Sequence, residues 1–376
     1  MATIYLDNHA STPLDPRVLE AMLPWLGGEC GNPSSRSHRH GWRAEEAVEN
    51  ARAQVADLIG ARPQEMVFTS GATESNNTVL KGVGRDTVVT TAIEHKSILA
   101  TCDWLVAKAG REIRIAGVDA CGIVEADSLF DLACDPSTTL VTIMAANNEV
   151  GTIQPIGMVG RQLSQRGFLV HSDAAQAIGR ISFDVRAMGL SFASLSAHKM
   201  HGPKGIGALF VADDVSHLLT PLAHGGGQER GLRSGTLNVP AIVGFGKACE
   251  IAKAEMSAEA PRIARMRDRL EAQLADAIPG LVVHGANRLP GNLNAALPCR
   301  DMGAFMAFVS DGVSLSVGSA CMSNDGMSHV LAAMGVGDDE SRRTIRIGVG
   351  RFNTDGEIAL AADAIARALD KANAMG

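Results

Sequence analysis

Short apolar runs, rich in β-branched residues, alternate with longer helical patterns through the first two thirds of the chain. Strands are expected at residues 65–69, 86–91, 138–144, 168–171, 192–195 and 206–211. Helical patterns lie between them, at residues 43–58, 75–83, 97–108 and 159–165. Strands that are joined through helices need crossover connections, which favours a mostly parallel sheet with helices on both faces.

The pattern changes after about residue 240. Residues 241–258 and 261–277 have the periodicity of two long helices, with Pro261 near the start of the second. Shorter strand-like runs follow at residues 281–284, 292–296, 314–317 and 344–349, before an amphipathic helix at 354–374. We therefore expect a large α/β domain at residues 15–260. Residues 1–14 and 261–376 are expected to form a smaller α+β domain.

Composition narrows the class of protein. Of the 376 residues, 46% are hydrophobic and 20% charged, as in ordinary soluble globular proteins. A formal net charge of -7 and 4% aromatic residues disfavour nucleic acid as a direct partner. The apolar runs are too short to span a membrane, and the start MATIYLDNHASTP lacks the basic and apolar regions of a secretion signal.

The cysteines point to a reducing compartment. There are seven, they are widely spaced, and none forms a C-x-x-C pair. No zinc or iron–sulfur ligand set is therefore expected, and no metal site. Reduced thiols in a cytoplasmic protein are the simplest interpretation.

Polar residues gather where the expected strands end. Five strands are followed by the segments FTSGATESNN, TTAIEHKS, TIMAANNEVG, LVHSDAAQAIG and SLSAHKMHGPKGIG. In an open α/β sheet, ligands bind beyond the carboxyl ends of the strands. Five such segments in succession predict one binding site at that edge.

Two of these segments suit an anionic cofactor. The small residues from Ser70 to Ser75 join a strand to a helix, where backbone N–H groups and the helix dipole favour a phosphate. A capping box at Ser70 is the competing interpretation. Asp173 follows an apolar run and is suited to pair with a protonated ring nitrogen, as pyridoxal phosphate requires. Its competing role is that of a helix N-cap.

Lys199 stands between an apolar strand and the rigid segment HGPKG. A lysine in such a place has a fixed stem and a lowered pKa, which are the properties of a lysine that forms a Schiff base. His95 ends another apolar strand. It is either a structural histidine or a partner of the lysine and the aspartate.

Two further residues carry candidate chemistry. Cys321 lies among small and polar residues in GSACMSNDG, which gives a nucleophilic thiol the access that it needs. Cys102, Cys249 and Cys299 have the apolar surroundings of structural cysteines. Arg346 lies within the apolar run TIRIGV and therefore needs an anionic partner, either a ligand or a structural carboxylate.

These motifs resemble the cysteine desulfurases of the NifS/IscS type, which are relatives of the class V aminotransferases and have the fold of type I pyridoxal-phosphate enzymes. The resemblance extends over nearly the whole chain. It includes IYLDNHASTPLDPRV, FTSGATESNN, EHKSIL, NNEVGTIQPI, HSDAAQAIG, SAHKMHGPKGIGALFV, HGGGQERGLRSGTLN, GSAC and IRIGVGRFNT. Each motif is weak alone, whereas the combination is specific.

The resemblance implies how the cofactor is held. Lys199 would form a Schiff base with pyridoxal phosphate, Asp173 would hold the pyridinium nitrogen and Gln176 the phenolic oxygen. His95 would stack on the ring and assist proton transfer. The residues implied for the phosphate are Ala72, Thr73, Ser196 and His198, with Thr236 from the neighbouring subunit of a homodimer.

The resemblance also implies the reaction. Asn148 and Arg346 would bind the carboxylate of L-cysteine, and the Cys321 thiolate would take its sulfur as a persulfide, leaving L-alanine. The sulfur would pass to an acceptor protein, for example a scaffold of iron–sulfur cluster assembly. One departure bears on that acceptor: relatives usually have Thr or Ser after the catalytic cysteine, whereas this chain has Met322 in a loop about one residue shorter.

Two alternatives remain open from the sequence. A selenocysteine lyase or a related β-lyase would use the same cofactor residues without needing Cys321. A non-catalytic scaffold would keep the fold for docking alone, but the presence of Lys199, Asp173 and His95 argues against it.

Overall fold

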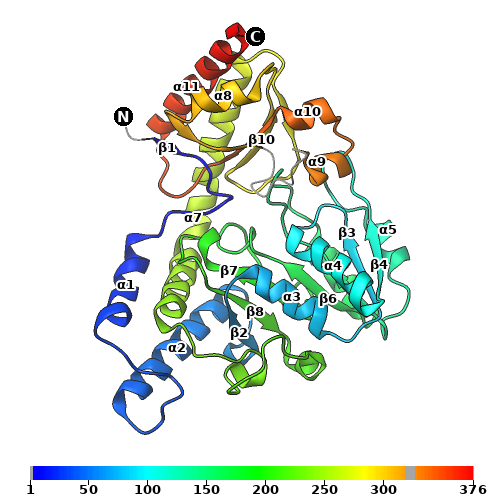
Figure 1. Cartoon of the computed structure of the whole chain (residues 1–376), viewed down its shortest axis with the longest axis vertical. Coiled ribbons are helices and arrows are strands. Elements are labelled where there is room, and N and C mark those ends of the chain that lie inside the picture. The colour runs from blue at the N-terminus through cyan, green and yellow to red at the C-terminus, as the bar shows by residue number, and fades with distance from the viewer. Residues whose placement is uncertain (1–2, 318–326, 376) are drawn as a thin grey trace.

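The computed structural model describes residues 3–317 and 327–375. Its main feature is a seven-stranded sheet, which lies in the lower half of Figure 1. The strand order is β2-β8-β7-β6-β5-β3-β4. The strands are β2 (Met66–Thr69), β3 (Thr87–Thr91), β4 (Glu112–Ala116), β5 (Thr139–Thr142), β6 (Leu169–Asp173), β7 (Phe192–Ser196) and β8 (Gly207–Val211).

Strand direction places the polar segments together. Strands β7, β6, β5, β3 and β4 are parallel, and β8 is antiparallel to both β7 and β2. Strand β2 therefore points the same way as β7, and only β8 runs in the opposite direction. The predicted mostly parallel sheet is confirmed, and the five polar segments leave it at one edge.

Helices cover both faces of this sheet. They are α1 (Pro16–Gly27), α2 (Arg39–Leu58), α3 (Ala72–Gly82), α4 (Lys96–Ala109), α5 (Ala126–Leu132) and α6 (Ile156–Gln165). Strands β2, β3, β5, β6, β7 and β8 are buried along their whole length. Their side chains alternate between one hydrophobic cluster with α2 and α6 and another with α3 and α4. Burial on both faces explains why these strands are continuous apolar runs.

The expectation of two helices around Pro261 is wrong. A single helix, α7, runs from Val239 to Ala277 with Pro261 inside it. A proline inside a helix costs about 3 kcal/mol, whereas burying one Leu or Met side chain gains about 1.5–3 kcal/mol. Beyond the proline, Met266, Leu270 and Leu274 are all buried in a second hydrophobic cluster, so packing outweighs the cost.

That second cluster lies under a smaller, four-stranded sheet of order β12-β13-β10-β9. Its strands are β9 (Val282–His284), β10 (Asn292–Ala296), β12 (Ser316–Val317) and β13 (Thr344–Gly348). The helices of this part are α8 (Met302–Val309), α9 (His329–Ala333), α10 (Asp338–Arg342) and α11 (Asp355–Met375). In Figure 1, α7 extends from the large sheet to this upper part.

The N-terminal segment joins the two parts. Strand β1 (Ile4–Tyr5) pairs in parallel with β11 (Val313–Ser314) beside the smaller sheet. The chain then turns towards the large sheet, where the Thr12 N–H donates to the carbonyl of His198. Residues 7–12 therefore lie against the carboxyl edge of β7. In the described part of the chain, no helix is both long enough and apolar enough to cross a membrane.

Candidate active site

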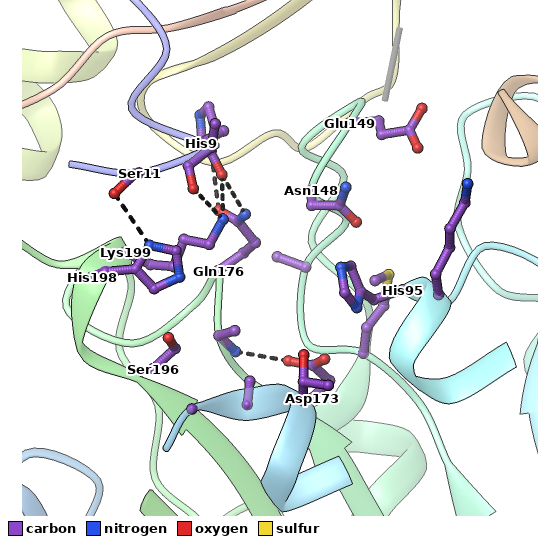
Figure 2. Close-up of a pocket in the computed structure, with 18 of the residues that line it drawn as sticks. His9, Ser11, His95, Asn148, Glu149, Asp173, Gln176, Ser196, His198 and Lys199 are labelled. Atoms are coloured by element: carbon purple, nitrogen blue, oxygen red, sulfur yellow. Dashed lines mark hydrogen bonds between the residues drawn. The ribbon is translucent and has the colours of Figure 1, made fainter. Parts of the chain in front are cut away.

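A cavity of about 640 Å³ opens at the carboxyl edge of the large sheet. Residues from all five polar segments line it, together with the N-terminal segment and Arg346 of β13. Figure 2 shows His198 and Lys199 on one side, His95 and Asn148 on the other, and Asp173 at the bottom of the view. The predicted residues that line it are Ala72, Thr73, His95, Asn148, Asp173, Gln176, Ser196, His198, Lys199 and Arg346.

The N-terminus of α3 forms one wall. Its N-cap is Gly71, and no side chain caps the helix there. Of the capping box considered at Ser70, one half is present: the Ser70 backbone N–H donates to the Glu74 carboxylate at 2.8 Å. A Cβ atom at Gly207 of β8 would lie 2.7 Å from the Gly71 Cα. Glycine at position 207 thus lets the start of α3 approach the sheet, with backbone donors facing the cavity.

Asp173 is the last residue of β6 and is 6% exposed. Its Oδ1 accepts from the Ala175 backbone N–H at 3.0 Å, and its Oδ2 from Asn76 Nδ2 at 2.7 Å. Turns rather than a helix follow it, so the helix N-cap interpretation is not what the structure contains. The carboxylate is a fixed negative charge at the cavity.

A chain of hydrogen bonds connects Asp173 with His95. The same Asn76 Nδ2 donates to Ser97 Oγ at 2.8 Å. Ser97 in turn donates to His95 Nδ1, through its backbone N–H at 3.1 Å and its hydroxyl at 2.8 Å. His95 therefore has the structural role of capping α4, and it also lines the cavity. Burial lowers the pKa of His95, which favours the neutral ring. Because Nδ1 accepts from the Ser97 backbone N–H, the hydrogen of the neutral ring is on Nε2.

Replacing Asn76 with alanine is expected to weaken cofactor binding by about tenfold or more, because residues that orient a site's ligands contribute on that scale. The substitution removes the donor shared by Asp173 and Ser97. Equilibrium dialysis followed by visible spectroscopy of the bound cofactor measures the effect. Asn77→Ala, one residue along the same helix, is the matched control. Equal cofactor retention in the two variants would contradict this role.

Lys199 lies in a short 3-10 turn, Ala197–Lys199, directly after β7. Its Nζ donates to the carbonyl oxygens of His9 at 2.6 Å and Ala10 at 2.8 Å. Burial, followed by repulsion from Arg180 and Arg346, lowers the pKa of Lys199 to about 7. A substantial fraction of this amine is therefore neutral near physiological pH, as a nucleophile or a base requires.

Arg346 is 1% exposed, and the structure contains the structural carboxylate that was one of the two interpretations made for it. Its Nη2 donates to Asp7 Oδ1 at 3.1 Å, so a structural carboxylate is present. Its Nη1 donates to the Asn148 carbonyl at 3.0 Å, and the side chain also borders the cavity. The buried Nε has no hydrogen-bond partner within the described residues, which leaves donor capacity for an anion.

Within the described residues, Thr236 is the one predicted site residue that does not line this cavity. Thr236 is exposed and does not line the site of its own chain. Cys321 lies outside the described residues. Within the described residues, no cluster of three His, Cys, Asp or Glu side chains is placed to bind a metal ion.

Among the contributors to the site that were missed from the sequence are His9, Asn76 and Arg180. Asn76 could have been noticed as a polar residue on the buried face of α3. His9 and Arg180 reach the site only because the N-terminal segment folds over the end of β7. No local pattern indicates that contact.

The cavity residues fit pyridoxal phosphate. The uncapped start of α3, with Ser196 and His198 nearby, suits a phosphate, and Asp173 suits a protonated ring nitrogen. Lys199 supplies an amine of lowered pKa on the same cavity. Asp173, Gln176, His95 and Lys199 would hold the ring, and the group would supply an electron sink.

Comparison with known proteins gives consistent matches. Residues 4–360 match the family described as aminotransferase class-V. A cysteine desulfurase IscS of Anaeromyxobacter dehalogenans is 47% identical over 364 residues, which cover 94% of this chain and 89% of the relative. A cysteine desulfurase of Homo sapiens is 44% identical over 364 residues, with 94% and 79% covered.

Solved structures agree with this grouping. A NifS-like protein superposes with a TM-score of 0.91 at 39% identity, covering 98% of this chain and 100% of that one. A structure described as SspA in complex with cysteine gives a TM-score of 0.83 at 38% identity, covering 94% and 100%. Sequence and structure therefore place the chain among the same relatives.

Proposed function

The chain belongs to the aminotransferase class-V family, and from this premise we propose that it is a pyridoxal-phosphate-dependent cysteine desulfurase. It converts L-cysteine to L-alanine and transfers the sulfur to Cys321. One observation carries the cofactor chemistry of the proposal: burial lowers the pKa of the Lys199 amine to about 7, and this amine shares a cavity with the Asp173 carboxylate and the uncapped start of α3. The cysteine desulfurases at 44–47% identity support the choice of substrate.

The charge of each cofactor residue determines its role in the reaction. Pyridoxal phosphate, when bound, supplies an electron sink that weakens the bonds at the substrate α-carbon. Lys199 Nζ is neutral in part and accepts the α-proton. Asp173 provides the fixed negative charge that keeps the ring nitrogen protonated. His95, neutral and anchored through Nδ1, holds a hydrogen on Nε2 that it can share within the cavity.

The substrate residues orient L-cysteine and take its sulfur. Arg346 and Asn148, which both line the cavity, would bind the carboxylate. The Cys321 thiolate then attacks the substrate sulfur: an S–S bond forms and the C–S bond breaks. The electron pair stays with the carbon fragment, which is protonated and leaves as alanine. L-cysteine and a thiol thus give L-alanine and a persulfide, with no external oxidant or reductant.

Incubation with L-cysteine tests the proposal. We expect one L-alanine for each persulfide in the first turnover, and mass spectrometry of the digest should find the added sulfur on Cys321. Sulfur on another cysteine would contradict the choice of nucleophile. Absence of alanine from protein that has bound the cofactor would contradict the function itself.

We also propose that the enzyme is a homodimer in which Thr236 reaches the phosphate site of the partner subunit. Thr236 is exposed and absent from its own cavity, which supports a role across an interface. Helix α1 carries three exposed leucines at a spacing of four and three residues, namely Leu19, Leu23 and Leu26. An apolar stripe of this kind is typical of a surface that another chain covers.

Leu23→Asp is therefore expected to produce monomers that retain the cofactor poorly, because the charge would be buried in the interface. Sedimentation velocity and visible absorbance measure the two effects. Leu360→Asp is the matched control, since Leu23 and Leu360 are both 55% exposed. A wild-type monomer that retains the cofactor fully would contradict the homodimer.

The cellular setting follows from the same chemistry. We propose a cytoplasmic enzyme, because the six cysteines within the described residues are free. The persulfide would pass to an acceptor protein, such as a scaffold of iron–sulfur cluster assembly. The two hydrophobic cores support a division into a large domain at residues 15–260 and a small one at 1–14 and 261–376, with α7 crossing between them.

A further inference from the structure

Arg180 is a largely enclosed guanidinium with an unusual set of partners. Its Nη1 donates to Gln176 Oε1 at 2.7 Å and to His9 Nδ1 at 2.5 Å. Its Nη2 donates to the carbonyl oxygens of Asn8 at 2.6 Å and Lys199 at 3.0 Å. All four acceptors are neutral, and within the described residues no carboxylate forms an ion pair with this side chain.

Other enclosed arginines of the chain differ from it. Arg52 is paired with Glu229, Arg346 with Asp7, and Arg351 with Glu259 and Asp15. Enclosing a cation without an anion is costly, and burial lowers the pKa of Arg180 to about 10. One side chain separates this positive charge from the cofactor cavity. A charge held in this way is suited to stabilise a negative charge on a bound ligand.

The hydrogen bonds also fix the orientation of the Gln176 amide. Arginine can only donate, so the atom of Gln176 that it contacts must be the oxygen. The amide nitrogen then faces the other way and donates to the His9 carbonyl at 3.0 Å, which leaves its second hydrogen for the cavity that Gln176 lines. His9 Nδ1 likewise accepts from Arg180, and burial lowers the pKa of His9 well below its usual value, so His9 is neutral.

We propose that Arg180 is a positioning residue of the cofactor site, which holds the Gln176 amide as a donor and supplies the positive charge that favours an anionic ring oxygen beside it. The inference rests on the proposed function, because that anion belongs to pyridoxal phosphate. The same charge also opposes protonation of the side-chain nitrogen of Lys199. Arg180 is close to this residue because its Nη2 donates to the Lys199 backbone carbonyl.

Other charges face Lys199 and set the background for a pH test. Arg346 opposes protonation of its amine, whereas Asp173 and Asp7 favour it. The neighbouring histidines whose titration is coupled to Lys199 are His9, His95 and His198. Burial lowers the pKa of each of these rings, so they are neutral near pH 7. Arg180 is thus a cation near Lys199 that can be removed without touching the carboxylates.

The test is a pH titration of the visible absorption band of the bound cofactor in wild type, Arg180→Gln and Arg180→Lys. Removing a positive charge makes protonation easier, so the midpoint in Arg180→Gln should rise by about one pH unit, at the lower end of what a nearby charge produces. Arg180→Lys keeps the charge and should remain close to wild type. Arg180→Met provides the same neutral test if Arg180→Gln does not fold.

The outcomes separate the inference from the function. A purely structural role would lower the thermal stability of both variants and leave the three midpoints equal, which would overturn the inference. Equal rises in the Gln and Lys variants would also overturn it, because charge would then be irrelevant. A wild-type protein with no visible band after addition of pyridoxal phosphate would instead contradict the proposed function.

Discussion

Replacing Lys199 with alanine is expected to lower the turnover of L-cysteine by at least about 10³-fold, because the variant loses both the covalent attachment point and the base. The physical reason is the state of one amine. Burial and the repulsion of two guanidiniums bring the pKa of Lys199 to about 7, so the amine can act near neutral pH. Among the described residues that line the cavity, Lys199 is the lysine whose Nζ donates to the carbonyl oxygens of both His9 and Ala10.

Release of L-alanine under saturating L-cysteine measures this effect. Lys247→Ala, on the surface of α7, is the control and should behave as wild type, because the ion pair of Lys247 is with Glu250 on the same helix and not with a cavity residue. The Lys199→Ala protein should still bind pyridoxal phosphate through Asp173 and the start of α3, although without a covalent bond. Activity within tenfold of wild type would contradict the assignment of Lys199.

Replacing Cys321 with alanine is expected to abolish sulfur transfer, by at least about 10²-fold, while the spectrum of the bound cofactor stays unchanged. The reason is that the thiolate forms the S–S bond, whereas the cofactor residues lie elsewhere in the chain. Production of alanine and of persulfide from L-cysteine should fall together. Cys30→Ala, which removes another exposed thiol, is the control.

The same variant separates two related enzymes. Selenium can leave the substrate without an enzyme thiol, so a selenocysteine lyase would keep its activity on selenocysteine when Cys321 is removed. Full activity of Cys321→Ala on L-cysteine would contradict the desulfurase mechanism. Full activity on selenocysteine alone would favour the lyase as a second activity of this site.

Much of the fold was predictable because strands that are buried on both faces are continuous apolar runs in the sequence. The central strands are buried on both faces, and the runs at residues 192–195 and 206–211 match β7 and β8 to within a residue. Strand β4 was missed because it lies at the sheet edge, where the charged residues Glu112 and Arg114 interrupt the apolar run. Helix α7 was predicted as two helices because the proline is visible in the local sequence. The packing that offsets its cost comes from residues distant in the sequence.

The candidate site was also predictable only in part. Residues that follow strands, such as Asp173 and Lys199, could be expected at one edge because parallel strands end together. The contacts of Arg180 could not be predicted from local sequence. They join it to residues 8–9, which are about 170 positions away in the chain. Asn76 was visible as a polar residue in a helix, but its link to His95 requires that α3 and α4 lie side by side.

Reduction of the cofactor-loaded protein with borohydride, followed by peptide mass spectrometry, tests the central claim most directly. We predict a pyridoxyl adduct on Lys199, formed at the amine that burial keeps reactive. A stable adduct on a different lysine, or none after the cofactor has bound, would contradict the claim that this amine carries the chemistry.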